Sequence, residues 1–226
     1  MKIAGIQKTS FIDYPGELAT VLFTSGCNFR CPYCHNSELL NQNYELEDKD
    51  WIQWLKSRQK NIDAIVISGG EPTLHSDLIE FLRKLKQEGF KVKLDTNGSN
   101  PKMLRQIIQD ELVDYVAMDL KGPASVYLDF SKDVEMFERI KESADLIIKT
   151  APDYEFRTTI TEELLNDHDF EECIDIINGA KKFYLQKFRD GDQVLAGKGN
   201  LNCVNDEHLK SLETLFTKRF DYFKIR

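Results

Sequence analysis

The sequence lacks a long apolar run, a surplus of basic residues and an even set of cysteines. No stretch approaches the ~18 apolar residues that a bilayer-spanning helix needs, and residues 1–5 lack a signal peptide's apolar core. Acidic residues outnumber basic residues by 38 to 30, which disfavours a nucleic-acid partner. An odd count of five cysteines argues against a disulfide framework. We therefore expect a cytoplasmic protein that binds neither membranes nor nucleic acid and uses its thiols for chemistry.

The alternation of apolar runs with segments of helical period predicts an α/β fold. Such alternation is typical of βα units around a parallel sheet. Six units predict a partial (β/α)6 TIM-like barrel of parallel strands. An extra N-terminal strand or hairpin arm at Lys2–Ile12 precedes a type II turn over residues 14–17. Residues 1–226 are expected to form a single domain. The predicted strands are Leu18–Thr24, Ala64–Ser68, Val92–Thr96, Tyr115–Leu120, Glu155–Ile160 and Phe183–Phe188.

Three cysteines lie within eight residues, directly after the first predicted barrel strand. Cys27, Cys31 and Cys34 are separated by three and then two residues. A loop with three thiolates can bind three irons of a cubane iron–sulfur cluster, which leaves the fourth iron open to an exogenous ligand. The alternative is a structural zinc site completed by His35 or His75, although such sites usually pair two cysteine-rich knuckles.

The other two cysteines have no partner at a ligand spacing. Cys173 shares an apolar helical face with Phe170, Ile174 and Ile177, so we expect a small core residue there. Cys203 lies in a predicted loop. The sequence therefore predicts one cluster only.

The spacing of Cys27, Cys31 and Cys34, with Tyr33 before the last cysteine, resembles the signature of the radical S-adenosylmethionine (SAM) enzymes. The His-Asn pair that follows extends the likeness to the activating enzymes of glycyl radical enzymes. The resemblance implies a [4Fe–4S] cluster on the three cysteines and SAM at its open iron. It also implies that SAM is cleaved reductively to a radical that takes a hydrogen atom from a glycine of the partner. A flavodoxin or ferredoxin-type protein is the implied electron donor.

The opening segments Ile3–Lys8 and Asp13–Gly16 resemble the activating proteins of the anaerobic ribonucleoside-triphosphate reductase. This likeness implies that reductase as the partner, with pyruvate formate-lyase as the alternative. No cysteine lies between Cys34 and Gly69, which excludes activating enzymes with added ferredoxin-like clusters. A radical SAM enzyme that acts on a small molecule or an RNA base is a further alternative, but it would normally need added substrate-binding elements.

Polar residues follow the predicted strands at the end where βα barrels carry their chemistry. The segment Gly69–Pro72 offers two glycines, at which the backbone can approach a ligand closely. It resembles the family's GGEP segment, which holds the amino group of SAM. Asp95 and Asn97 share one side of the next strand, and Asp119 and Lys121 share one side of the strand after it. If those sides face inward, the buried carboxylates need a cation or a polar ligand.

Both of these later segments resemble pyruvate formate-lyase activating enzyme, where aspartates help to hold a monovalent cation beside the SAM carboxylate. By that likeness Asp95, Thr96, Asp119 and the Ala117 carbonyl are candidate cation ligands. The alternative is an Asp119–Lys121 ion pair that only closes the barrel. Arg157 matches an arginine of that family and suits a carboxylate, although a structural salt bridge would look the same in sequence.

The likeness fails at the sixth strand, where Phe188 replaces a ribose-contacting histidine and Gln186 or Arg189 is the candidate substitute. The predicted site is otherwise complete. Its candidate catalytic residues are Cys27, Cys31, Cys34, Asp119 and Lys121. Its candidate cofactor-binding residues are Tyr33, Gly69, Gly70, Glu71, Pro72, Asp95, Asn97 and Arg157.

Overall fold

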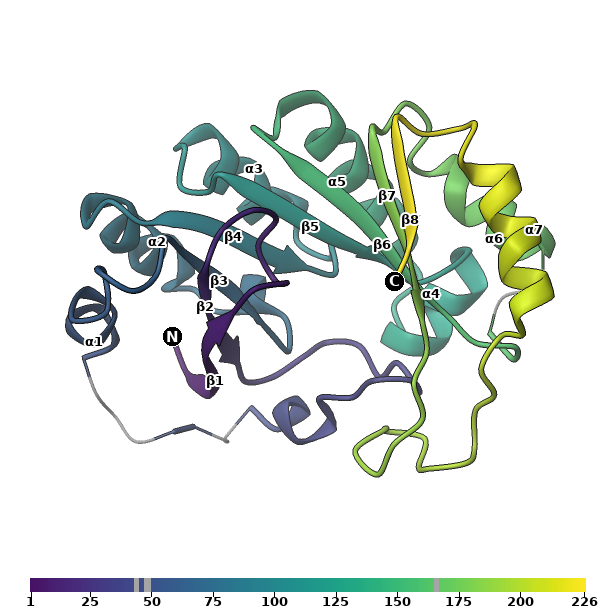
Figure 1. Ribbon diagram of the computed structural model, residues 1–226, viewed down its shortest axis with the longest axis horizontal. Coiled ribbons are helices and arrows are strands. Elements are labelled where there is room, and N and C mark those ends of the chain that lie inside the picture. Colours follow the sequence, from purple (N-terminus) through teal and green to yellow (C-terminus); the bar gives the residue numbers. More distant parts are fainter. Residues whose placement is uncertain (43–44, 47–49, 165–166) are drawn as a thin grey trace.

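The computed structural model of the protein describes residues 1–42, 45–46, 50–164 and 167–226. One eight-stranded sheet forms its centre, with the strands arranged in chain order (Figure 1). The first strand runs antiparallel to the second, and each later strand is parallel to its neighbour. The strands are β1 (Ile3–Ser10), β2 (Ala19–Thr24), β3 (Ala64–Gly69), β4 (Lys91–Thr96), β5 (Tyr115–Leu120), β6 (Tyr154–Ile160), β7 (Lys182–Lys187) and β8 (Tyr222–Ile225).

This sheet confirms the predicted α/β class and the six predicted parallel strands, but it corrects the strand count. β8 adds a seventh parallel strand, so the sheet is an open partial barrel whose edges are β1 and β8. The prediction missed β8 because this strand has only four residues, alternately exposed and half-buried, and therefore shows no apolar run. The predicted N-terminal strand is present as β1, which pairs with β2. Gly16, at φ +78°, and the Glu17 amide bond to the Tyr14 carbonyl (3.3 Å) confirm the type II turn.

Local sequence signals set the limits of the helices between the strands. The Asn205 side chain accepts the His208 amide at 2.9 Å and caps α7. Asn100 caps α3 in the same way, and Pro101 supplies its first residue. The helices are α1 (Trp51–Lys56), α2 (Leu78–Gln87), α3 (Pro101–Gln109), α4 (Ala124–Ser131), α5 (Met136–Thr150), α6 (Asp167–Asp175) and α7 (Asp206–Phe216), with 3₁₀ turns η1 (Ser37–Leu40) and η2 (Pro72–Leu74).

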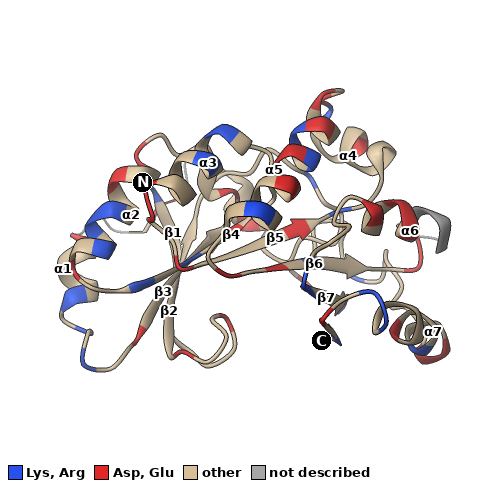
Figure 2. Cartoon of the chain, turned by 90° about the horizontal axis from the view of Figure 1, so that it is seen from above, with Lys and Arg blue, Asp and Glu red and all other residues tan. Residues whose placement is uncertain are grey.

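The two faces of the sheet differ in chemistry. The outer face carries fully buried aliphatic side chains such as Ile67, Leu94 and Val116, which pack in the main core under the helices. Figure 2 shows α2, α3 and α5 along this side of the sheet. Burying each such side chain contributes roughly 1.5–3 kcal/mol. The inner face has a smaller apolar cluster near the amino ends of the strands. Charged residues lie on the same face, nearer the carboxyl ends of the strands. No helix in the described residues is long and apolar enough to cross a bilayer.

Candidate active site

A cavity of about 400 Å³ opens at the carboxyl ends of the parallel strands. The loop that carries the three cysteines, Cys27–Cys34, follows β2 and forms one wall; we call it the cysteine loop. The ends of β3, β4, β5, β6 and β7 form the rest. Most of the residues predicted for the site meet here. Those that line the cavity are Cys27, Cys31, Tyr33, Cys34, Gly69, Gly70, Glu71, Asp95, Thr96, Asn97, Asp119, Lys121, Gln186, Phe188 and Arg189.

Three predicted residues lie nearby without lining the cavity, and seven lining residues are absent from the predicted set: Phe29, His35, Asn36, Leu40, Ser68, Thr159 and Lys187. Pro72 begins η2, Ala117 is buried on the inner face of β5, and Arg157 lies behind Asp119. Three of these missed residues have signals in the sequence. Thr159 follows Arg157 at the period of two that defines a strand face, and Ser68 is the last side chain before the glycine pair. Phe29 lies inside the cysteine loop itself.

Backbone and aromatic contacts fix the cysteine loop. The Arg30 guanidinium donates to the carbonyls of Cys27 (2.8 Å) and Phe29 (2.9 Å), and its amide donates to the Phe130 carbonyl of α4 (3.0 Å). The Phe29 ring packs edge-on against Tyr127. These contacts hold the loop in one conformation, which a multi-thiolate site requires.

A second segment, after β7, clamps the other end of the loop. The Leu195 amide donates to the Cys34 carbonyl (3.0 Å), and the Ala196 amide donates to the Pro32 carbonyl (2.9 Å). The Ser37 hydroxyl donates to the Gln193 carbonyl at 2.8 Å. The two segments therefore join across the mouth of the open barrel, where β1 and β8 do not pair with each other.

The three cysteines are free thiols, with Cys31 buried and Cys27 and Cys34 half-buried. Burial raises the pKa of Cys27 to about 12 and that of Cys31 to about 11. A positively charged centre must therefore offset the burial before these sulfurs become thiolates. Within the described residues, no three His, Cys, Asp or Glu side chains converge as ligands of a single ion, so the zinc alternative gains no support. His75 instead contacts the Ser25 carbonyl, at 2.9 Å from its Nε2 atom.

The glycine pair after β3 is required by packing within the protein. A Cβ on Gly70 would lie 1.9 Å from the Gly26 carbonyl oxygen, and a Cβ on Gly69 would lie 2.3 Å from the Thr24 nitrogen. The Gly70 amide donates to the Thr24 carbonyl (2.9 Å), and the Glu71 amide donates to the Gly26 carbonyl (2.8 Å). The glycines thus bring β3 against the start of the cysteine loop, as well as lining the cavity.

The Glu71 carboxylate is fully buried and bonded on both oxygens. It accepts the Thr73 amide (3.1 Å), the Thr96 hydroxyl (2.8 Å) and the Asn97 amide (2.6 Å), together with the Thr73 hydroxyl (2.5 Å). Burial raises the pKa of Glu71, and these hydrogen bonds oppose the rise. The carboxylate therefore joins the end of β3 to the end of β4, a role that the sequence does not reveal.

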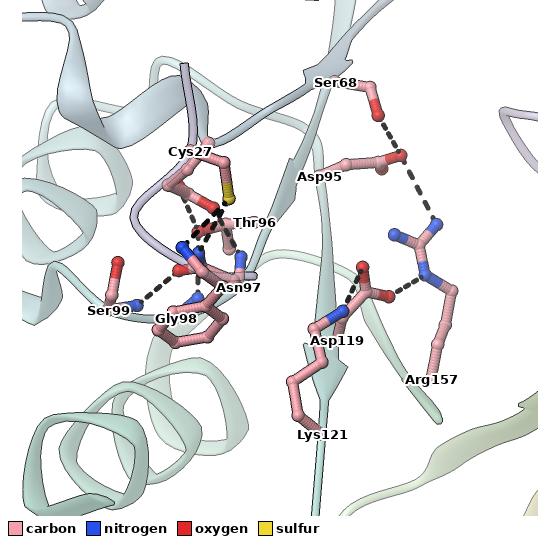
Figure 3. Close-up of polar contacts among 12 residues, drawn as sticks. Cys27, Ser68, Asp95, Thr96, Asn97, Gly98, Ser99, Asp119, Lys121 and Arg157 are labelled. Carbon is pink, nitrogen blue, oxygen red and sulfur yellow. Dashed lines mark hydrogen bonds and ion pairs between the residues drawn. The ribbon is translucent and has the colours of Figure 1, made fainter. Parts of the chain in front are cut away.

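Charges of alternating sign cross the inner face of the sheet (Figure 3). Lys93 binds Asp95 at 2.6 Å, and Arg157 binds Asp95 at 3.4 Å and Asp119 at 2.7 Å. At the end of this row of charges, the Lys121 Nζ atom lies 3.4 Å from the Asp119 Oδ2 atom. Burial raises the pKa of Asp95 and of Asp119, but Arg157 and the adjacent lysines outweigh it. As a result, the pKa of Asp95 is lowered and that of Asp119 falls to about 2. We call these five residues the charge ladder.

The charge ladder bears on the predicted cation site. Both predicted aspartates already have cationic protein partners, and the Thr96 hydroxyl donates to Glu71. The predicted Asp119–Lys121 ion pair is present. The monovalent cation on Asp95, Thr96, Asp119 and the Ala117 carbonyl stays a prediction.

The sequence profile described as the radical SAM superfamily matches residues 21–182, which include the cysteine loop, β3 and the charge ladder. The chain belongs to this superfamily. A protein of Methanocaldococcus jannaschii, named as a glycyl-radical enzyme activating enzyme, is 34% identical over 99% of this chain and 95% of the relative. A protein of Saccharolobus solfataricus, named as a GTP 3′,8-cyclase, is 27% identical over 90% of this chain and 66% of the relative.

Solved structures share the fold of this radical SAM enzyme. The crystal structure of Streptococcus suis SuiB bound to S-adenosylmethionine matches with a TM-score of 0.69 at 15% sequence identity. The match covers 91% of this chain and 51% of SuiB, so the chain spans about half of that protein's length. The superfamily implies a [4Fe–4S] cluster and SAM. Three free thiols that line one polar cavity fit both groups.

Proposed function

We propose that this radical SAM enzyme activates a glycyl radical enzyme. The observation that carries the proposal is the likeness to the Methanocaldococcus activating enzyme over almost the full length of both chains. The matched region takes in the cysteine loop, the charge ladder and the cavity between them. We therefore propose that the partner is a protein that supplies its own glycine to the cavity.

Cys27, Cys31 and Cys34 would hold the cluster, and the cavity beside them would hold SAM. Bound together, the two groups supply a carbon radical that can take a hydrogen atom from a glycine. The inner-face charges suit the zwitterionic methionine end of SAM, because a carboxylate and an ammonium group can each find an opposite charge there. We assign Asp95, Asp119 and Lys121 to this end of the cavity, with Arg157 holding the two aspartates in place.

The remaining predicted residues would contact the cofactor through backbone or ring. Gly69 and Gly70 line the cavity with Glu71 behind them, and Pro72 turns the chain into η2. Tyr33 is buried beside Cys31, with its ring 5.8 Å from the Lys121 Nζ atom. We propose that these residues shape the cavity so that SAM lies against the open iron.

For the partner, we propose the anaerobic ribonucleoside-triphosphate reductase, on the likeness of Ile3–Lys8 and Asp13–Gly16 to its activating proteins. Pyruvate formate-lyase is the alternative. A flavodoxin or ferredoxin-type protein would deliver the electron. A GTP 3′,8-cyclase activity is a weaker candidate, because the chain spans only 66% of that relative.

The deciding experiment uses the 226-residue chain, reconstituted with iron and sulfide without oxygen. After reduction with dithionite and addition of SAM, we expect methionine and 5′-deoxyadenosine to form. With the reductase present, we expect a glycine-centred radical in the electron paramagnetic resonance (EPR) spectrum. SAM cleavage without a glycyl radical on either candidate partner would defeat the activase assignment, and cyclisation of GTP would replace it.

A further inference from the structure

The side chain of Asn97 reaches from the end of β4 to the cysteine loop. Its Nδ2 atom lies 2.9 Å from the Asn28 Oδ1 atom and 3.9 Å from the Cys27 sulfur (Figure 3). The Phe29 amide is a second donor to the same sulfur, at 3.4 Å. Cys27 therefore receives an N–H group from its own loop and another from the sheet.

The position of the Asn97 amide group is fixed from several directions. Its backbone amide donates to buried Glu71 at 2.6 Å, and its Oδ1 atom accepts the Ser99 amide at 2.9 Å. With the oxygen engaged, the nitrogen must face Asn28 and Cys27. Asn97 is only 6% exposed, so water does not compete freely for these bonds.

Hydrogen bonds to cysteine sulfur are one of the main controls on the reduction potential of an iron–sulfur cluster. An N–H donor stabilises negative charge on a thiolate. The reduced cluster carries one more electron than the oxidised cluster, so it gains more from the donor. Removing such a donor lowers the potential and makes the cluster harder to reduce.

We propose that Asn97 is a positioning residue that raises the reduction potential of the cluster through Cys27, with Glu71 holding it in place. This inference rests on the proposed cluster at the three cysteines. It adds a role that SAM binding alone would not give to Asn97. Glu71 accepts hydrogen bonds from Thr96 and Asn97, so it connects the segment Gly69–Pro72 to Cys27.

The test compares Asn97→Ala and Asn97→Ser with the control Ser99→Ala. The Ser99 hydroxyl is buried and has no hydrogen-bond partner among the described residues. The Ser99 amide, which the control variant keeps, donates to the Asn97 Oδ1 atom. Each protein is reconstituted with iron and sulfide. Its iron content is measured, and its midpoint potential is determined by an EPR-monitored titration without SAM. This readout does not depend on activity.

We expect Asn97→Ala to keep its iron and to shift the reduction equilibrium about tenfold toward the oxidised cluster, which is about 59 mV for one electron. Asn97→Ser keeps an oxygen for the Ser99 amide but is too short to reach Cys27, so the same shift is expected. Ser99→Ala should match the wild type. If the Asn97→Ala protein loses its iron, the midpoint potential of the Asn97→Ser protein tests the inference instead.

Wild-type potential in an iron-loaded Asn97 variant would overturn the inference. Loss of iron from both Asn97 variants would also overturn it, because Asn97 would then serve assembly rather than potential. A wild-type protein that binds no [4Fe–4S] cluster would overturn the proposed function as well. A cluster-loaded wild type with unshifted variants would overturn the inference alone.

Discussion

The outer and inner faces of the same strands follow opposite rules. In β4, Val92 and Leu94 point outward into the apolar core, while Lys93 and Asp95 point inward. In β5, Met118 packs outside, and its neighbour Asp119 binds Arg157 inside. The outer face gains stability from each methyl group that it buries. The inner face carries desolvated charges, which contribute to stability only while every partner is present.

This difference separates the face that builds the fold from the face that performs chemistry. Ion pairs as buried as those of the charge ladder are often no more stabilising than apolar side chains of similar volume. Their presence beside the cysteine loop is therefore better explained by a polar ligand than by stability. Substitutions on the two faces should have different signatures, and these signatures test the comparison.

The largest expected effect contrasts the cluster cysteines with Cys173, which lies on α6 in the main core. Cys27→Ala, Cys31→Ala or Cys34→Ala should abolish SAM cleavage, because each removes one of three iron ligands. Cys173→Ala should lower only stability, by roughly 1 kcal/mol, since Cys173 is a buried core residue as predicted. Iron content, SAM cleavage and urea unfolding measure these effects. Equal activity losses in the two groups would contradict the one-cluster model.

The next effect tests the charge ladder. Arg157→Gln leaves Asp95 and Asp119 without their shared partner, and loss of one member of a buried pair costs roughly 3–5 kcal/mol. We expect both a lower free energy of unfolding in urea and weaker SAM binding. Arg157→Lys keeps the positive charge but loses the planar guanidinium group. We therefore expect it to restore the free energy of unfolding more fully than the affinity for SAM. Unchanged stability in Arg157→Gln would show that the ladder does not act as a unit.

Much of the outer face could be predicted from sequence, because its signals are local. The strands show as apolar runs, Gly16 marks a turn that needs positive φ, and Asn205 marks a helix start. The cysteine loop was equally visible, since its ligands lie within eight residues. These features depend on neighbours in the chain, so a single sequence is sufficient to find them.

The inner face depends on partners that are distant in sequence. Lys93 alternates with apolar residues in a way that suggests a solvated face, yet its side chain is only 2% exposed because Asp95 neutralises it. Arg157 binds an aspartate 62 residues away. The sequence offers Glu71 as a cofactor-binding residue, but Thr73, Thr96 and Asn97 donate hydrogen bonds to its buried carboxylate. Only the sheet register brings these groups together.

A third prediction addresses stability on the outer face alone. Leu94→Ala removes a fully buried side chain from the main core and should cost about 3 kcal/mol of unfolding free energy. Because Leu94 points away from the cavity, the folded variant should keep the wild-type KM for SAM. Urea unfolding and SAM cleavage below the unfolding transition measure the two effects. A raised KM would mean that the faces are coupled through β4.

The smallest effect distinguishes the two candidates for the missing ribose contact. Gln186 is half-buried and lines the cavity from the inner face of β7, whereas Arg189 is exposed beyond the end of that strand. A neutral hydrogen bond contributes about 1 kcal/mol, so Gln186→Ala should raise the KM for SAM about fivefold with little change in stability. Arg189→Ala should change the KM less, because a solvated guanidinium gains little from one contact. The opposite order would place the adenosyl end of SAM at the outer rim, and the inner face of β7 would then contribute shape rather than a ligand.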